Sequence, residues 1–188
     1  MAAFKLVVSL LNAEDAITTD IKEEGSSIYI IGKTYDELGG SQYYSLLNAT
    51  GRNAPKVRAA EAKENMESLT KAMRSGLVRS CHDLSEGGLA VAAAEMAFSG
   101  SIGISIDAEK IPNEIDKSCK LLFSESNSRF LAEVRRKDEK QFEETATAAR
   151  KIGITTAEKK LIISHRGSNV IDADLHELKS AWQGTIKW

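Results

Sequence analysis

Short apolar runs with strand-like alternation are separated along this chain by stretches with helical spacing. Isoleucine occupies positions 102, 104 and 106, which is the period-two pattern of a strand with one buried face. A run rich in β-branched and aromatic residues follows Gly25. These patterns predict strands at residues 26–33, 77–81, 102–106 and 130–134, with shorter strands at 4–11, 153–156, 160–164 and 169–171.

Apolar residues three or four positions apart predict helices between these strands. Ala62, Met66, Leu69 and Met73 form such a stripe, which we expect to be the buried face of a helix over residues 55–75 that ends at Gly76. Further helices are predicted at residues 42–49, 89–98, 111–119 and 137–151, with a last helix through Leu178 and Trp182 capped by Asp172 or Asp174. Because strands and helices alternate irregularly, we expect an α/β (α+β) fold, a mixed β-sheet packed with helices, with residues 1–188 as a single domain.

The stretch of residues 80–97 holds the strongest candidate for chemistry. An apolar strand leads into His82 and Asp83, the turn at residues 85–88 reads Ser-Glu-Gly-Gly, and an almost wholly apolar helix follows. Glycines ahead of a helix start leave backbone N–H groups available, which suits an anion such as phosphate. The candidate ligand-facing residues of this turn are His82, Asp83, Ser85, Gly87 and Gly88.

A structural interpretation of the same turn stays open, and spacing alone favours it. Asp83 and Glu86 have the spacing of a capping box, His82 can be a satisfied structural residue, and the glycines can let the helix pack closely on the strand. The chain has neither a GxxxxGK[ST] nor a GxGxxG pattern. A nucleotide, if bound, is therefore held by a route other than a P-loop or a Rossmann turn.

The second candidate is the group Ser124, Glu125, Ser126 and Arg129. It places hydroxyls, a carboxylate and a guanidinium within six residues, and an arginine beside serines can hold phosphate bidentately. A solvated turn with a weak Glu125–Arg129 pair fits the sequence equally well. The glycine pair before Ser41 is better explained as a helix cap than as a ligand loop.

The composition narrows the class of protein. Of the 188 residues, 42% are hydrophobic and 28% charged, as in ordinary soluble globular proteins. The formal net charge of −2 gives no electrostatic reason to expect nucleic acid or an anionic membrane as a partner. Cys81 and Cys119 form neither a disulfide framework nor a zinc spacing, so we expect a cytoplasmic protein. No apolar run reaches the ~20 residues of a membrane helix.

Three segments resemble one known family in their sequence and in their order. They are YIIGKTYDELGGSQYY (residues 29–44), HDLSEGGLAVAAAEMA (82–97) and LLFSESNSRF (121–130). Together they resemble the C-terminal domain of phosphoribosylformylglycinamidine synthase, the large synthetase subunit of purine biosynthesis. The resemblance begins near Ile17 and implies a fold like the C-terminal domain of aminoimidazole ribonucleotide synthetase. Residues 1–17 are then interpreted as a remnant of an upstream domain or a linker.

The resemblance implies an activity for the complete enzyme. ATP and magnesium activate the amide of formylglycinamide ribonucleotide, and ammonia from a separate glutaminase displaces the phosphate to give the amidine. The family's catalytic histidine, its magnesium carboxylates and most ATP contacts lie on N-type domains with no counterpart here. We therefore assign no catalytic residue and no metal ligand, and we expect the isolated chain to be inactive and to bind no cofactor tightly.

The resemblance also implies partners and a possible second site. The expected partners are the N-terminal domains of the same synthetase, the glutaminase subunit and a small accessory subunit, with a homodimer of the isolated domain as a further option. By internal symmetry, Ser124, Glu125 and Ser126 would face a pseudo-equivalent of the substrate-phosphate site. Two alternatives stay open, a non-catalytic binding or assembly domain and a domain of aminoimidazole ribonucleotide synthetase or selenophosphate synthetase.

Overall fold

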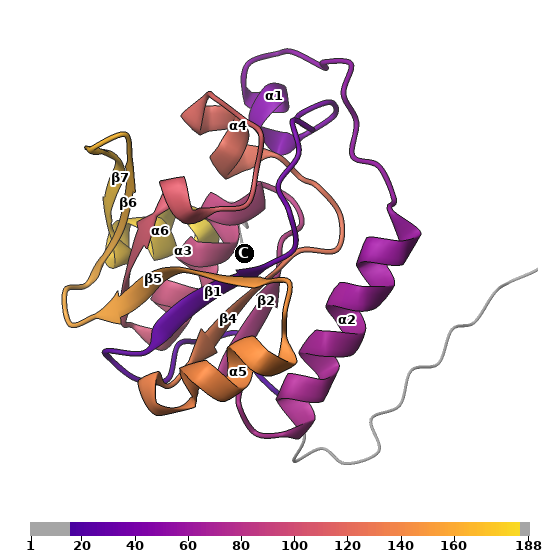
Figure 1. Ribbon diagram of the computed structural model, residues 1–188. Helices are drawn as coiled ribbons and strands as arrows, with labels where there is room; N and C mark the ends of the chain where they lie inside the picture. The colour runs from indigo at the N-terminus through magenta and orange to yellow at the C-terminus, as the bar shows by residue number, and fades with distance from the viewer. Residues whose placement is uncertain (1–15, 185–188) are drawn as a thin grey trace, which may run out of the picture.

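The computed structural model describes residues 16–184, which form one mixed seven-stranded sheet with helices on both faces (Figure 1). The strands are β1 (Ser27–Ile31), β2 (Ser80–Asp83), β3 (Gly103–Asp107), β4 (Phe130–Val134), β5 (Ala149–Thr156), β6 (Lys160–His165) and β7 (Ser168–Asp174). Their order across the sheet is β2-β4-β1-β5-β3-β6-β7. All neighbours are antiparallel except β3 and β6, which are parallel. The predicted mixed sheet is thus confirmed, while the strand expected at residues 4–11 lies outside the described residues.

Each face of the sheet is covered by its own set of helices (Figure 1). On one face lie α3 (Gly88–Gly100), α4 (Ser118–Phe123) and α6 (Leu175–Gln183); on the other lie α2 (Ala59–Arg74) and α5 (Glu139–Thr145). The short helix α1 (Gln42–Leu46) and the 3₁₀ turns η2 (Ala108–Lys110) and η3 (Arg136–Asp138) complete the helical elements of residues 16–184.

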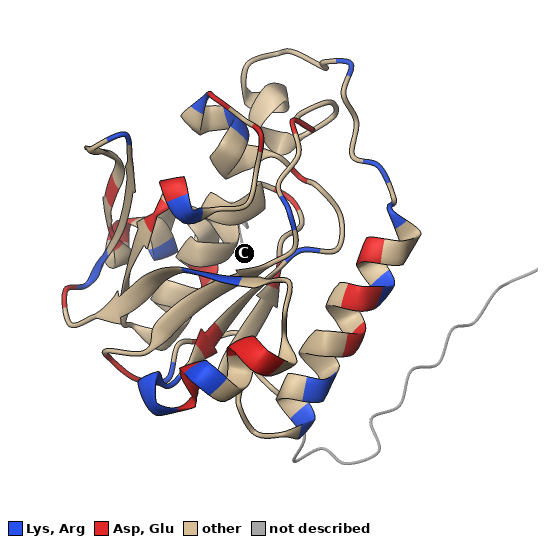
Figure 2. Ribbon diagram, in the orientation of Figure 1, with Lys and Arg blue, Asp and Glu red and all other residues tan. Residues whose placement is uncertain are grey.

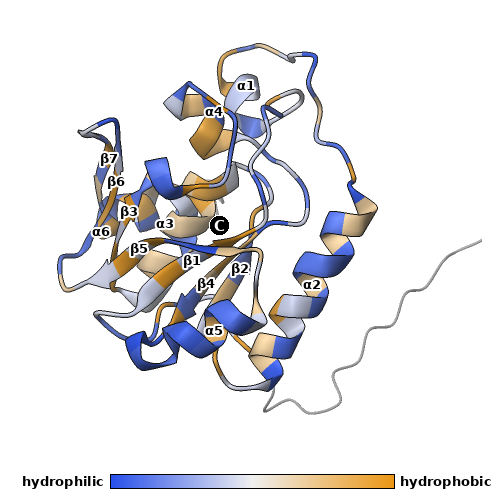
Figure 3. Ribbon diagram, viewed as in Figure 1, coloured by the Kyte–Doolittle hydropathy of each residue, from blue (hydrophilic) through white to orange (hydrophobic). Residues whose placement is uncertain are grey.

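The two faces of β1 serve two separate hydrophobic cores. Ile28 and Ile30 pack with α3, whereas Tyr29 and Ile31 pack with α2 and α5, and all four side chains are buried. A central strand with helices on both faces is expected to be apolar at every position. Figure 3 shows this apolar character in the strands and in α3. Because α3 is buried along nearly its whole length, its start is fixed firmly against the sheet.

The long helix α2 differs from the prediction in its start and in its buried face. It begins at Ala59 instead of Pro55, and its buried residues are Asn65, Leu69 and Ala72, while Met66 is exposed. Leu69 of the predicted stripe is buried and Met73 packs against the same core, whereas Asn65 takes the buried position next to Met66 and its side-chain amide donates to the Ser128 carbonyl oxygen at 3.1 Å. Charged residues of both signs recur along α2 in Figure 2.

Two other predicted helices were wrong in position or length. Within residues 111–117, Asn113 forms a parallel β-bridge with Thr34. The helix of this region is α4, which starts later, at Ser118. The helix predicted over 137–151 ends at Thr145, because residues from Ala149 onward pair with β1 and β3. The pairing of β5 with β1 on one side and with β3 on the other stabilises a strand here, although the spacing of apolar residues at its start is typical of a helix. The cap of the last helix was predicted correctly, since Asp174 Oδ1 accepts from the backbone N–H groups of His176 and Glu177.

A buried carboxylate on β4 ties residues 22–23 to the sheet. Glu133 is fully buried, and its two oxygens accept from the backbone N–H groups of Lys22 and Glu23 and from the Ser80 hydroxyl, at 2.9–3.2 Å. A buried carboxylate is tolerated when its oxygen atoms accept hydrogen bonds from the donors around them.

We expect the substitution Glu133→Gln to lower the free energy of unfolding by about 2 kcal/mol. The NH₂ group of the glutamine side chain would replace one acceptor oxygen and place a donor against a buried donor. Urea denaturation measures the change, with Glu144→Gln on the exposed face of α5 as the matched control. Equal midpoints for the two variants would contradict the role given to Glu133.

Candidate functional site

The predicted turn follows β2 at the edge of the sheet and leads into α3. The Leu84 N–H donates to the Arg129 carbonyl oxygen at 3.0 Å, and the Gly88 N–H donates to the Ser85 carbonyl oxygen at 3.1 Å. Gly87, the N-cap of α3, has a φ of 77°, a left-handed conformation that favours glycine. Strand, glycine turn and buried helix therefore succeed one another as the sequence predicted.

The capping-box interpretation of this turn is wrong. The Asp83 carboxylate accepts from the Ser85 hydroxyl, and no side chain of the turn itself caps α3. This hydrogen bond is the main cause that lowers the pKa of Asp83 below its usual value. The N–H of Gly87 instead donates to Oε1 of Glu125 at 2.9 Å. The acceptor for the N–H of the N-cap residue thus comes from the second candidate segment, far away in the sequence.

His82 is tied to two helices. Its Nε2 lies 2.8 Å from Oε2 of Glu95 on α3, and Oε1 of Glu95 accepts from the indole N–H of Trp182 on α6 at 3.1 Å. Its Nδ1 is buried and lies 3.3 Å from Asp83 Oδ1, in a geometry that makes no hydrogen bond. The structural interpretation of His82 as a residue that joins β2 to α3 and α6 therefore gains support.

Gly88 has a packing role that the sequence left open. A Cβ atom at this position would lie 2.5 Å from the Ser124 carbonyl oxygen and 3.0 Å from that of Leu122, and the φ of Gly88 is 62°. The glycine therefore allows the start of α3 to press against the backbone that follows α4. The two candidate segments, 83–88 and 124–129, are thereby brought into direct contact.

The serines of the second candidate segment are buried and serve the chain itself. The Ser124 hydroxyl accepts from the Glu37 N–H at 3.2 Å, and the Ser126 hydroxyl accepts from the Tyr35 N–H at 3.1 Å. Neither serine is exposed to solvent. The expectation that Ser124 and Ser126 face a ligand is corrected on this point, because their hydroxyls hold residues 35–37 in place.

Arg129 is also enclosed. It is 1% exposed, and its guanidinium donates to the carbonyl oxygens of Ser124 and Ser126 and to the Thr34 hydroxyl. Burial lowers the pKa of Arg129 to about 10, so the group remains charged at neutral pH. Its donors bind the segment around it, and the bidentate contact with phosphate that the sequence left open as one alternative is not what the structure shows. The solvated-turn alternative, with its Glu125–Arg129 pair, is likewise not what the structure shows.

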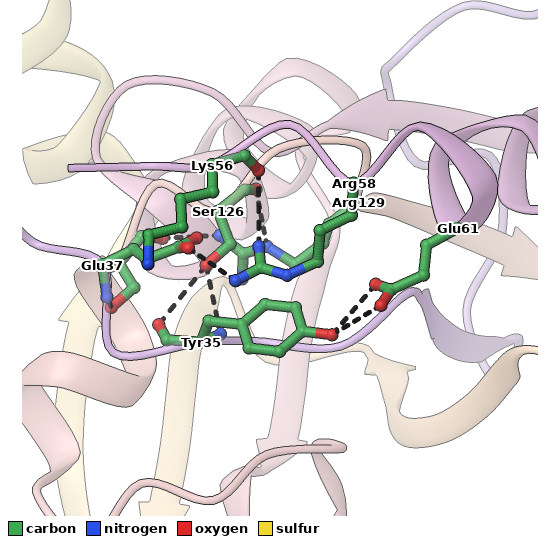
Figure 4. A network of polar contacts seen from close by, with 8 residues as sticks. Tyr35, Glu37, Lys56, Arg58, Glu61, Ser126 and Arg129 are labelled. Atoms are coloured by element: carbon green, nitrogen blue, oxygen red, sulfur yellow. Dashed lines mark hydrogen bonds and ion pairs between the residues drawn. The ribbon is translucent and has the colours of Figure 1, made fainter. Parts of the chain in front are cut away.

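A network of polar contacts fastens the irregular residues 47–58, which we call the strap, beside these segments (Figure 4). The Arg58 guanidinium lies 3.4 Å from the centroid of the Tyr35 ring and donates to Glu37 Oε1 at 2.8 Å. The Tyr35 hydroxyl donates to Glu61 at 2.9 Å. Sequence reasoning missed Tyr35, Glu37 and Arg58 as members of the site. The only sequence signal for these residues was that Tyr35 and Glu37 lie within the segment TYDELGG.

Two pockets flank the turn at residues 83–86. One of about 450 Å³ is lined by Asp83, Ser85, Glu86 and Glu125 together with Pro55 of the strap and Met66 of α2. The other, of about 650 Å³, shares Asp83, Ser85 and Glu86 and adds His82, Glu95 and Trp182. Each lining therefore holds three carboxylates, and buried Arg129 is the only lysine or arginine among the residues that line either pocket. The local charge favours an approaching cation or a polar neutral group over a free anion.

The described part of the chain offers no metal centre. Within residues 16–184 no three His, Cys, Asp or Glu side chains are grouped so that they could hold a metal ion.

Ser41 has the capping role predicted for it, since its hydroxyl accepts from the Tyr44 N–H at 3.2 Å at the start of α1. None of the helices in residues 16–184 is long and apolar enough to cross a membrane.

The packing role of Gly88 predicts an unequal effect of two glycine substitutions. Gly76 also has a positive φ, 69°, but a Cβ atom there meets nothing within 4 Å. Both Gly88→Ala and Gly76→Ala add backbone strain, and only the first forces a Cβ onto backbone atoms. We expect Gly88→Ala to lower the free energy of unfolding by about 2 kcal/mol more than Gly76→Ala. Thermal or urea unfolding measures the difference, and equal losses would contradict it.

Comparison with known proteins places the chain in a family. The family model described as AIR synthase related protein, C-terminal domain, matches residues 11–166. The chain is 38% identical over 174 residues to the phosphoribosylformylglycinamidine synthase subunit PurL of Thermococcus sibiricus, covering 90% of this chain and 24% of that protein. It is 35% identical to the PurL subunit of Methanothrix thermoacetophila, covering 92% of this chain and 22% of the relative. The chain thus spans about a quarter of the length of these relatives.

Solved structures share the fold. The structure described as T. maritima PurL complexed with FGAR superposes with a TM-score of 0.78 at 18% identity, over 88% of this chain and 30% of that one. E. coli HypE superposes with a TM-score of 0.60 at 16% identity, over 85% of this chain and 52% of that one. At these identities the likeness concerns the fold alone. With a family match that covers most of its length, and with this fold, the chain belongs to the family of AIR synthase related protein C-terminal domains.

Proposed function

We propose that this chain is the C-terminal domain of a phosphoribosylformylglycinamidine synthase. The complete enzyme would be an ATP-dependent ligase of purine biosynthesis in the cytoplasm that converts formylglycinamide ribonucleotide, with glutamine-derived ammonia, to the amidine. The observation that carries this proposal is the 38% identity to the T. sibiricus PurL subunit along 90% of the chain. The higher TM-score to T. maritima PurL than to HypE agrees with it.

The residues of this chain would support the site without doing its chemistry. ATP and Mg²⁺ would be held by other domains of the complete enzyme, as the family resemblance implies. The structures of T. maritima PurL with ATP and with ADP support nucleotide use by the complete enzyme. His82, Asp83, Ser85 and Gly87 are the candidate residues on the substrate-facing side, because all four line the larger pocket and Asp83 and Ser85 also line the smaller one.

The partners proposed for this chain are the N-terminal domains of the same synthetase, a glutaminase subunit and a small accessory subunit. The structure described as PurLQS from T. maritima, which superposes on this chain with a TM-score of 0.73, supports such an assembly. The strap and the end of α1 expose Leu46, Leu47 and Val57, at 82%, 59% and 78% of their surface. Exposed apolar side chains of this kind favour contact with another domain over free contact with water; a homodimer of the isolated chain would cover the same surface.

A chimera tests the proposal. This chain would replace the matching C-terminal quarter of the T. sibiricus PurL subunit, and amidine formation would be measured with ATP, Mg²⁺, formylglycinamide ribonucleotide and ammonia. We expect the chimera to be active and the isolated chain to show no turnover, because the other domains would hold the nucleotide and the metal.

The controls separate folding from function. Thermal unfolding shows whether the chimera is folded, and the T. sibiricus subunit truncated before the same domain gives the background rate. A folded chimera with no activity above that background, or turnover by the isolated chain, would refute the proposal.

A further inference from the structure

We propose that residues 185–188 of this chain, which we call the tail, occupy the larger pocket, of about 650 Å³. The tail reads Thr-Ile-Lys-Trp and follows Gly184, the last residue that the structure describes. Ile186 and Trp188 would pack on the helices of the pocket, and the Lys187 ammonium group would face its carboxylates. The proposal concerns the chain itself and does not depend on the enzyme to which it belongs.

Helix α6 runs along α3 from the end of α3 toward its start. The first residue of α6, Leu175, donates its backbone N–H to the Lys159 carbonyl oxygen at 3.0 Å, and the Lys159 ammonium group donates to the carbonyl oxygen of Ser101, the C-cap of α3. Further along α6, the indole N–H of Trp182 donates to Glu95, in the middle of α3, at 3.1 Å. The chain therefore leaves α6 in the direction of the start of α3, where the larger pocket lies.

The tail is long enough to reach the far end of the pocket. Glu95 and Gly87, the N-cap of α3, both line the pocket. They are separated by about 12 Å along the helix axis, at a rise of about 1.5 Å per residue. From Trp182, which lies beside Glu95, an extended chain reaches about 16 Å by Lys187. The whole lining is therefore within the span of the tail.

The pocket combines an apolar wall with an acidic wall. Val91 of α3 and Trp182 of α6 form the apolar wall, and they are 37% and 55% exposed. Asp83, Glu86 and Glu95 contribute three carboxylates, and the described residues that line this pocket include no lysine or arginine. Exposed apolar side chains beside uncompensated negative charge suit a segment that carries both apolar groups and a positive charge.

The sequence of the tail matches these two walls. Side chains alternate between opposite sides of an extended segment, so Ile186 and Trp188 would share one side and Lys187 would take the other. The two apolar side chains would then cover Val91 and the ring beside it, while the Lys187 ammonium group would meet the exposed carboxylate of Glu86.

The tail in this position would cover one side of the turn and leave the other side open. Asp83, Ser85 and Glu86 also line the smaller pocket, of about 450 Å³, which has Pro55 of the strap in its wall. A group that approaches the turn would therefore meet it from the smaller pocket, unless it displaced the tail.

Nuclear Overhauser effects in the full chain test the position of the tail. We expect cross-peaks between the aromatic protons of Trp188 and the methyl groups of Val91, and we expect them to be lost in Lys187→Glu. Lys179→Glu is the matched control, because it makes the same charge change at an exposed residue of α6 that does not line the pocket. Absence of the cross-peaks from the wild-type chain, or equal intensities in the two variants, would overturn the proposal.

An exchange of charges tests the contact between Lys187 and Glu86. Glu86→Lys alone is expected to weaken the same cross-peaks, and the double variant Glu86→Lys, Lys187→Glu is expected to restore them. No recovery in the double variant would refute this pairing. Mixing isotope-labelled with unlabelled chains shows whether the contact lies within one chain. Cross-peaks that arise only between chains would overturn the proposal and assign the pocket to a second copy.

Fluorescence gives a second measurement, for the case in which the charge variants do not fold. The chain has two tryptophans, Trp182 and Trp188, so Trp188→Phe leaves Trp182 as the only one. Truncation after Gly184 has the same effect and also removes the tail. We expect the acrylamide quenching constant of Trp182 to be about twofold higher in the truncated chain than in Trp188→Phe, because the tail would no longer contact the ring.

Equal quenching constants in these two proteins, with thermal unfolding showing that both are folded, would overturn the proposal. None of these measurements involves catalysis, so their outcome is separate from that of the chimera.

Discussion

The buried guanidinium of Arg129 is the constraint on which the rest of the site depends. A charged group with 1% exposure is tolerated only when fixed acceptors surround it. Arg129 finds them in the carbonyl oxygens of Ser124 and Ser126 and in the Thr34 hydroxyl. These bonds hold the segment after α4 in one shape, and that segment in turn contacts residues 35–37 and the starts of α1 and α3.

Successive side chains of residues 124–126 have two different roles. The hydroxyls of Ser124 and Ser126 hold the backbone of residues 35–37, while Glu125 between them reaches the starts of α1 and α3. Gly88 completes the arrangement, because only a residue without a Cβ lets α3 approach the Ser124 carbonyl oxygen. The acceptor is a carboxylate, and Asp83 and Glu86 lie nearby. The turn therefore carries negative charge, which does not favour the binding of phosphate.

This arrangement suits a domain that completes a larger enzyme. The chain matches about a quarter of the length of its PurL relatives, and the turn at residues 83–86 separates two pockets on its surface. The strap, fastened by Arg58 on Tyr35 and Glu37, leaves Val57 exposed. Under the proposed function, the turn and the exposed Leu47 and Val57 of the strap would form a surface for neighbouring domains.

The sequence by itself determined most strands of the described residues, the strand–turn–helix order at residues 80–97, the cap at Ser41 and the choice of Asp172 or Asp174 as the last cap, because periodicity, glycine and capping chemistry act over a few residues. It also identified the two candidate segments as parts of one family pattern. Only the tertiary structure decided that Glu125, and not a residue of the turn, accepts from the N–H of Gly87, that β5 replaces the end of a predicted helix, and that Arg129 is buried. Each of these outcomes depends on a partner far away in the sequence, and such partners are fixed only when the sheet and its helices pack.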